Sequence, residues 1–422
     1  MIHIAPNPQS KNRKMKETSF GTTKIHFWWT EHTKTIIILI IGVTAIIAAV
    51  RMGYEFWRLI SMTGPDGAID LRLRYNEVLS WFSGQTVYQD PSRAGYAPAS
   101  YVMLWPFVGW LDFRQVRWLW AATSALALGG LICLVVKEIG AKTTLERSFW
   151  ILMLLSVYPV AITIGNGQLG IHIILAIIGC VLILLPERKV SFGGDLLAAV
   201  LFVFALTKLN FTIPFLWVVL LVPGRLRPIM LTGLGYGALT LLAVSMRSEP
   251  VWILFSDFFH MTSELVNRQS GAHLANFMTA LGLEEWVSLG SVVFLGILGI
   301  WVNGNRHADL WILLGVSGIV ARLWTYHRMY DDILILLPMI ALYRVAKQGY
   351  QVNRGSGIAG ILFVCGWIGL EMPGTLGRMS FPWNLPYDIG QTIIWSAMLV
   401  FLIIYARQTK RATVVEQQGL AS

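Results

Sequence analysis

The feature that most constrains this sequence is a long series of apolar runs, because a helix of about 20 apolar residues crosses a lipid bilayer. Hydrophobic residues make up 55% of the 422 residues, and charged residues make up only 13%. A soluble domain carries about 25% charged residues, so roughly half of the expected charge is missing. The composition therefore predicts an all-α polytopic membrane protein.

The first predicted span is 35–50 with its flanks, and eleven further apolar runs follow it. A shorter run at 101–111 contains Pro106, and we interpret it as interfacial or re-entrant rather than spanning. The interval 193–222 has a polar hinge at Lys208, which leaves a re-entrant arrangement open there. The sequence thus predicts about 12 transmembrane helices. The eleven further runs are 118–136, 148–164, 169–185, 193–208, 211–222, 229–246, 288–303, 309–324, 332–346, 356–371 and 389–406.

Basic residues predict the orientation of these spans. If 101–111 does not span, the short basic loops fall on the side of the N-terminus, which the positive-inside rule assigns to the cytoplasm. Both termini are then cytoplasmic, in the plasma (inner) membrane, and the outer face holds the loops 51–117 and 247–287. The same rule accounts for the net charge of +10 without nucleic-acid binding. The basic residues of the inner loops are Lys137, Lys142, Arg147, Arg188, Lys189, Arg225, Arg227, Arg306, Lys347 and Arg354.

The chain divides into a cytoplasmic N-terminal tail (1–34), a transmembrane domain (35–406) and a cytoplasmic C-terminal tail (407–422). The three cysteines all lie in apolar runs, without the spacing of a metal site, and we expect no disulfide framework. The motifs of P-loop, serine-hydrolase and zinc-protease sites are absent from the sequence. A D-x-D motif, which holds the metal and the nucleotide in many sugar-nucleotide transferases, is absent as well. If the protein transfers a sugar, this absence favours a donor whose leaving group is not a nucleotide.

The first outer loop contains a predicted amphipathic helix. Leu71, Tyr75, Val78 and Phe82 recur at i, i+4, i+7 and i+11, which makes one apolar helical stripe. Such a helix can lie in the membrane interface, with its apolar face towards lipid and its charged face towards water or a cavity. The adjacent, charged stripe consists of Asp70, Arg74 and Glu77.

Three other polar groups lie at the predicted outer face. The Gly-Asn-Gly-Gln segment at 165–168 is either a ligand site, with accessible backbone and two amides, or a tight turn between helices. Lys208 ends an apolar run, where it either binds an anion such as phosphate or snorkels to the interface. The segment 324–332 places His327 and Arg328 where they can hold a lipid phosphate, although its aromatic residues are also typical of an interfacial belt.

Taken in order, these segments resemble the GT-C class of polytopic glycosyltransferases, and within it glycosyltransferase family 87, whose members use polyprenyl-phosphate sugars. The resemblance covers about residues 66–340. Ala99 stands where that family has a second proline, and Asn210 and Phe211 stand where it has Gln and Pro. The elements that carry the resemblance are Asp70, Tyr75, Gly84, Tyr88, Tyr96-Ala97-Pro98, Gly165-Asn166-Gly167-Gln168, Lys208, Asn267-Arg268-Gln269-Ser270, His327 and Tyr330-Asp331.

The resemblance implies a GT-C fold and an inverting transfer of mannose or arabinofuranose from a polyprenyl-phosphate donor. The acceptor would be a hydroxyl of a glycolipid or glycan at the extracytoplasmic face, in cell-envelope biosynthesis. An acidic residue of the first outer loop is the general base in this class. Asp70 matches that base best, and Asp66 is next. A structural alternative for Asp70 is an i, i+4 ion pair with Arg74.

The resemblance also implies which residues bind the substrates. We interpret the loop 247–287 as a lid over the acceptor, because extended loops in compact proteins often serve as lids. The expected ligands of the donor phosphate are Lys208, His327, Arg328 and Arg268. The expected substrate-binding residues are Tyr75, Tyr96, Asn166, Gln168, Asn267, Tyr330 and Asp331.

Two other functions fit a chain of this kind. A transporter or flippase of a lipid-linked sugar would share the many spans and broken helices, but it would also carry an internal repeat and ionisable groups at mid-membrane. A non-catalytic scaffold of an envelope assembly would tolerate replacement of Asp70. No cofactor is implied, and the sequence leaves a divalent metal, the sugar, the acceptor and the oligomeric state open.

Overall fold

Helices build the whole of the protein that the structure describes. Every regular element in the described residues is a helix, which confirms the all-α class. The computed structural model describes residues 9–85, 87–88, 95–185, 191–268, 274–349, 355–374, 376, 379, 383 and 385–421.

The helices follow one another with short connections. The first half contains α1 (Gln9–Ile60), α2 (Ile69–Phe82), α3 (Pro98–Val108), α4 (Phe113–Glu138), α5 (Thr144–Ser156), α6 (Tyr158–Asn166), α7 (Gly170–Leu184) and α8 (Phe192–Ala205). The second half contains α9 (Leu209–Thr212), η1 (Ile213–Phe215), α10 (Leu216–Leu221), α11 (Arg227–Ser245), α12 (Val251–Arg268), α13 (Leu274–Ala280), η2 (Glu284–Trp286), α14 (Val287–Gly304), α15 (Leu310–Leu323), η3 (Met329–Ile335), α16 (Leu336–Lys347), α17 (Ser356–Glu371) and α18 (Leu385–Ala421).

Several of these helices are long and apolar enough to cross a membrane, so the protein is a multi-pass membrane protein. Five pass by length and composition among the described residues, and six pass if the bent pair α5–α6 counts as one span. Helical segments lie on all of the predicted runs, but five of the apolar helices have only 10–17 residues. At 1.5 Å per residue they fall short of a hydrocarbon core about 30 Å thick, so the count of about 12 spans stays a prediction. The five long spans are Thr35–Ile60, Phe113–Glu138, Arg227–Ser245, Glu284–Gly304 and Pro386–Thr409.

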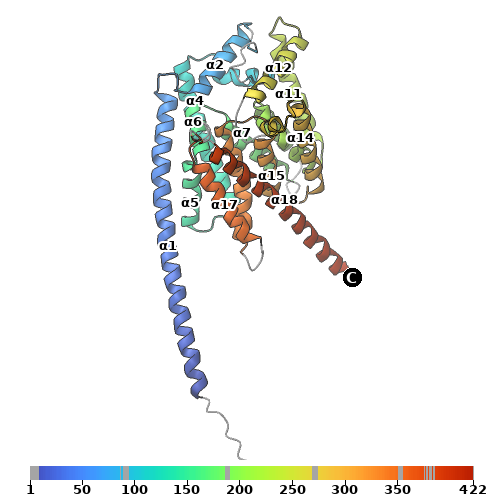
Figure 1. The fold of residues 1–422 in the computed structure, drawn as a ribbon. Coiled ribbons are helices and arrows are strands. Elements are labelled where there is room, and N and C mark those ends of the chain that lie inside the picture. The colour runs from blue at the N-terminus through green and yellow to red at the C-terminus, as the bar shows by residue number, and fades with distance from the viewer. Residues whose placement is uncertain are drawn as a thin grey trace, which may run out of the picture.

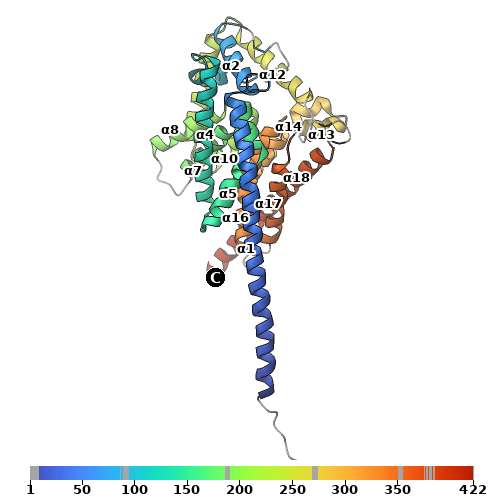
Figure 2. The ribbon, with the colours of Figure 1, turned by 90° about the vertical axis from the view of Figure 1, so that its left-hand side faces the viewer.

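The first helix is much longer than the run predicted for it. α1 has 52 residues, and Figure 1 shows that its N-terminal part extends well past the helical bundle. Figure 2 shows α1 running in front of α5, on the outside of the bundle. Arg117 of α4 satisfies carbonyls at the end of α1, where a helix leaves its last C=O groups unpaired. Its guanidinium donates to the carbonyl oxygens of Leu59, of Arg58 (3.0 Å) and of Met62 (2.8 Å).

The predicted span at 148–164 is not one straight helix, because the chain breaks there into α5 and α6 at an angle of 49°. Val157 leaves the helical region, with ψ of 133°, and Pro159 follows within the first turn of α6. Proline has no N–H to donate and its ring clashes with the carbonyl four residues earlier, so a helix bends or ends before it. Because of this break, α6 packs against η3, α1 and α2.

The predicted helix in the first outer loop is present as α2, but its apolar stripe packs against the protein core, with Tyr75 and Phe82 half-buried. Leu71 and Val78 of the apolar stripe belong to the hydrophobic core of the protein rather than facing lipid. The charged stripe is buried too. The short run at 101–111 overlaps α3, which has only 11 residues with Pro106 inside it. Its non-spanning interpretation stays a prediction.

The predicted outer loop 247–287 is largely helical, because it contains α12, α13 and η2. Figure 1 shows α2 and α12 at the same end of the bundle. The buried Phe258 of α12 lies against Tyr88, with ring centroids 5.7 Å apart. α12 therefore packs on the segment that joins α2 to α3.

Candidate active site

A buried acidic pair at the start of η3 organises the first half of the site. Asp331 is 3% exposed, and its Oδ1 forms an ion pair with the Lys208 ammonium. Its Oδ2 lies 3.0 Å from Nδ1 of His327 and accepts from the backbone N–H of Arg328 at 3.3 Å. Burial raises the pKa of Asp331, but Lys208 and His327 outweigh burial and hold that pKa well below its usual range. Asp331 is therefore ionised, and the ammonium of Lys208 balances its charge.

This arrangement changes the roles expected for two predicted phosphate ligands. Lys208 is itself buried and is paired with Asp331, and its Nζ lies 5.1 Å from the ring centroid of Tyr330. Burial lowers the pKa of His327, and the hydrogen bond to Asp331 only partly opposes that shift. His327 is therefore mainly neutral at pH 7, and it offers no positive charge to a phosphate.

The neighbouring Asp332 is also paired, through residues that the sequence reasoning missed. Its Oδ1 forms an ion pair with Arg322 of α15, and its Oδ2 accepts from Gln391 of α18 at 3.4 Å. Arg322 stands inside an apolar run, and an ionisable residue in such a run was the available signal. The two ion pairs and the hydrogen bond from Gln391 fasten η3 to the N-cap of α9, to α15 and to α18.

The second half of the site comes from α2. Asp70 is 7% exposed, and its Oδ2 accepts no hydrogen bond within the described residues. The alternative pairing of Asp70 with Arg74 is not the one observed, because Arg74 Nη1 lies 2.6 Å from Glu77 Oε2. The Arg74 guanidinium also stacks 4.3 Å from the ring centroid of Tyr96. By contrast, Asp66 is exposed.

The charge of Asp70 on α2 shifts the pKa values of residues at the start of η3, so the two halves of the site form one polar cluster. Burial raises the pKa of Tyr330 well above its usual value, and the charge of Asp70 adds to that rise. Burial lowers the pKa of Arg328, but Tyr330, Tyr326 and Asp70 outweigh burial and raise it above its usual value. Arg328 therefore stays positively charged close to Asp70. Tyr96, Tyr326 and Arg328 are only half-buried, so they form the accessible edge of the cluster.

The Gly-Asn-Gly-Gln segment is a packed turn between α6 and α7. The carboxylate of Glu55 in α1 occupies the space where a side chain on residue 165 would stand. Asn166 accepts a hydrogen bond from Arg58 through its Oδ1. Gly167 ends α6 with φ of +71°, and a Cβ there would lie 2.5 Å from Cβ of Leu71. These contacts favour the tight-turn interpretation, and they place Leu71, and with it the neighbouring Asp70, against α6.

Replacing Gly167 by Ala is expected to destabilise the protein by about 1–3 kcal/mol more than replacing Gly140 by Ala. Both glycines have positive φ, of 71° and 61°, so both variants lose about 1–2 kcal/mol to backbone strain. A Cβ on residue 140 meets open space, whereas a Cβ on residue 167 clashes with Leu71. Thermal unfolding of both variants in the same detergent measures the difference. Equal losses would mean that α2 moves aside freely.

The structure brings some predicted site residues together and leaves others apart. Asp70, Tyr96, Lys208, His327, Arg328, Tyr330 and Asp331 form the polar cluster. Tyr75 is half-buried, and its hydroxyl donates to the carbonyl of Leu111 at 3.1 Å. Gln168 is buried beside the turn. The side chains of Asn267 and Arg268 lie outside the part of the chain that the structure describes. Among the described residues, no group of three or more His, Cys, Asp and Glu could hold a metal ion.

Comparison with known proteins identifies the family. No curated protein and no solved structure matches the chain. The model of glycosyltransferase family 87 matches residues 95–345, which is more than half of the chain. The matched part includes Lys208 and η3, whereas α2 with Asp70 precedes it. The chain belongs to glycosyltransferase family 87.

Proposed function

We propose that this glycosyltransferase moves a sugar, mannose or arabinofuranose, from a polyprenyl-phosphate donor to an acceptor hydroxyl. The acceptor would be a glycolipid or glycan at the extracytoplasmic face, and the helices would adopt the GT-C fold. The observation that carries the proposal is Asp70, a buried carboxylate with a free oxygen close to the half-buried, positively charged Arg328. A buried polar atom without a partner is rare in a folded protein, and a substrate hydroxyl would satisfy this one.

The chemistry follows from these two side chains. Asp70 accepts the proton of the acceptor hydroxyl while that oxygen bonds to the anomeric carbon of the donor sugar. The bond from the anomeric carbon to the phosphate oxygen breaks, and polyprenyl phosphate leaves with the electron pair. Attack from the side opposite the leaving group inverts the anomeric centre. Negative charge grows on the phosphate during this step, and a fixed cation in a site with little water stabilises it strongly.

Arg328 is the best candidate for that cation. Its guanidinium is half-buried, and its Nε is buried without a hydrogen-bond partner within the described residues. Lys208 is held by Asp331, and His327 is mainly neutral. We therefore assign the donor phosphate to Arg328, and we assign Lys208 and His327 to the positioning of Asp331, whose carboxylate accepts from the backbone N–H of Arg328.

The placement of charges supports an extracytoplasmic site. The polar cluster lies at the C-terminal end of α15 and the start of η3. At the opposite ends of α15 and α16, Arg306 lies in the connection before α15 and Lys347 ends α16, and the positive-inside rule assigns both to the cytoplasm. α15 has 14 residues, so these ends lie about 20 Å apart along its axis.

The test is sugar transfer by the purified full-length protein in lipid nanodiscs. The protein is offered polyprenyl-phosphate mannose, arabinofuranose or glucose together with a native membrane lipid extract, and mass spectrometry detects the glycosylated product. We expect transfer from one polyprenyl-phosphate donor and none from the matching nucleotide sugars. Transfer from a nucleotide sugar alone would refute the donor class. No transfer, combined with scrambling of the lipid-linked sugar in liposomes, would support the flippase instead.

A further inference from the structure

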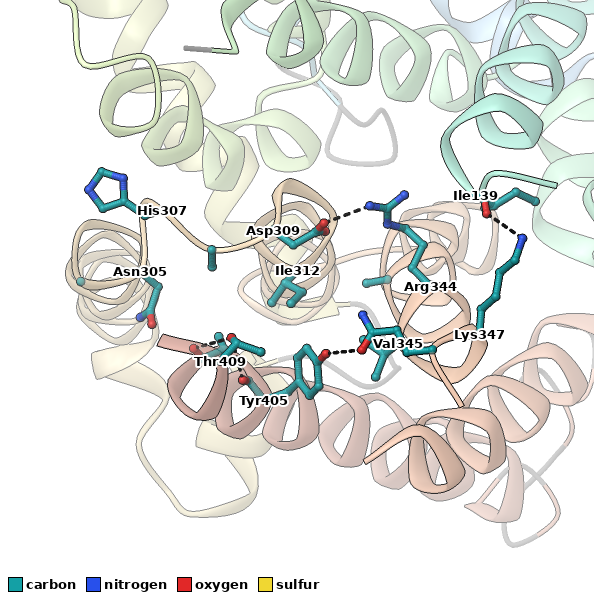
Figure 3. A pocket seen from close by; sticks show the side chains of 15 residues that line it. Ile139, Asn305, His307, Asp309, Ile312, Arg344, Val345, Lys347, Tyr405 and Thr409 are labelled. Carbon is teal, nitrogen blue, oxygen red and sulfur yellow. Dashed lines mark hydrogen bonds and ion pairs between the residues drawn. The ribbon is translucent and has the colours of Figure 1, made fainter. Parts of the chain in front are cut away.

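A second polar region lies at the end of α15 remote from the candidate active site. A half-open cavity of about 670 Å³ opens there between the ends of α14, α15 and α16 and the middle of α18. Small-molecule sites in proteins enclose about 300–1,000 Å³, so this cavity is large enough for a ligand. Figure 3 shows Asp309, Arg344 and Lys347 along one side of it and Tyr405 and Thr409 along the other.

The lining combines an apolar wall with a basic rim. Ile139, Ile312 and Val345, all nearly fully buried, form the apolar wall, and Arg344, Lys347 and His307 supply nitrogen donors at the rim. A purely ionic ligand would leave the apolar side of the cavity unfilled, and a purely apolar ligand would not contact the charged groups of the rim, which also include Asp309. The cavity therefore fits an amphiphile with an anionic head group.

The two cations of the rim can accept an additional anion. Arg344 lies 3.0 Å from Asp309, with side chains 34% and 43% exposed, and Arg344 Nε is buried without a hydrogen-bond partner within the described residues. Lys347 Nζ lies 2.5 Å from Glu146 Oε1 and also donates to the carbonyl oxygens of Gly140 (2.6 Å) and Ile139 (3.3 Å), so it binds an anion by exchanging one of these contacts. The exposed Arg344–Asp309 pair contributes little to stability, so a phosphate can share or replace the Asp309 carboxylate at small cost.

The position of the cavity suggests where the amphiphile comes from. The basic inner loops, among them those with Lys142 and Arg306, surround this end of the bundle. Basic pockets between transmembrane helices on the cytoplasmic side commonly bind the head groups of anionic lipids. We propose that this cavity binds the phosphate of an anionic phospholipid of the cytoplasmic leaflet at Arg344 and Lys347. Its acyl chain would lie against Ile312 and Val345.

The proposal is independent of the transferase reaction, and it is tested by lipid binding rather than by activity. The full-length protein in detergent is titrated with phosphatidylglycerol or with phosphatidylcholine of the same acyl chains, and native mass spectrometry counts the lipids retained. We expect tighter retention of phosphatidylglycerol. Replacing Arg344 by Gln removes one charged phosphate contact, so the dissociation constant should rise about tenfold.

Two further variants test whether the effect of Arg344→Gln comes from lost lipid binding rather than from a change in folding or in net charge. Ala308→Phe narrows the cavity at a lining residue without a change of charge, and it should weaken retention as Arg344→Gln does. Arg306→Gln removes the same charge from an exposed residue outside the lining, and it should change retention by less than about twofold. Equal retention of the two lipids, or equal effects of Arg306→Gln and Arg344→Gln, would overturn the proposal. Displacement of the lipid by millimolar inorganic phosphate would also overturn it, in favour of a soluble phosphate ligand.

Discussion

Replacing Asp70 by Asn is expected to lower the rate of sugar transfer by about 10³-fold, because a general base contributes about 10²- to 10⁴-fold to a rate. The amide has the shape of the carboxylate but cannot take the proton of the acceptor hydroxyl. The fold should survive, since Asp70 Oδ2 makes no hydrogen bond within the described residues and the ion pair of Arg74 is with Glu77. Transfer is measured with the donor found in the nanodisc assay, and folding is measured by thermal unfolding.

The matched control is Asp66→Asn, the same chemical change four residues earlier. Asp66 is exposed, so this variant should keep the rate within about twofold. A loss of transfer in Asp66→Asn, with normal transfer in Asp70→Asn, would move the base to Asp66. Normal transfer in both variants would exclude Asp70 and Asp66 as the base and would favour a scaffold role for Asp70.

The positions of the helices could be read from the sequence because they depend on local hydropathy. Apolar runs must be buried in lipid or protein as helices, and the structure has helices on all of the predicted runs. The break between α5 and α6 also had a local signal, Pro159, in the middle of the predicted span. The additional N-terminal length of α1 had no such signal. Its first turns are polar, so hydropathy does not mark where the helix begins.

The partners of the charged residues could not be read from the sequence. Arg74 has a carboxylate four residues before it and another three residues after it, and both are on its face of a helix. The choice of Glu77 over Asp70 depends on what packs around α2, and it leaves Asp70 Oδ2 unbonded. Lys208 and Asp331 are 123 positions apart, so only the tertiary fold brings the N-cap of α9 next to η3.

The pairing of Lys208 with Asp331 leads to the second large expected effect, on stability. Replacing Lys208 by Met keeps most of the side-chain volume but leaves Asp331 as a buried carboxylate without its main counter-charge. Removing one partner of a buried pair destabilises a protein by about 3–5 kcal/mol. That loss is a large part of a total stability of about 5–15 kcal/mol, so the thermal unfolding midpoint of this variant in detergent should fall sharply.

Adding Asp331→Asn to Lys208→Met removes the uncompensated charge, so the double variant should recover most of the lost stability. The transfer rate of this restored protein then distinguishes the two roles of Lys208. If Lys208 only holds Asp331, and Arg328 binds the donor phosphate, transfer should stay within about tenfold of the wild type. A stable double variant with a loss of about 10³-fold would instead mean that Lys208 contacts the phosphate directly, because the loss of a charge-stabilising contact has that size.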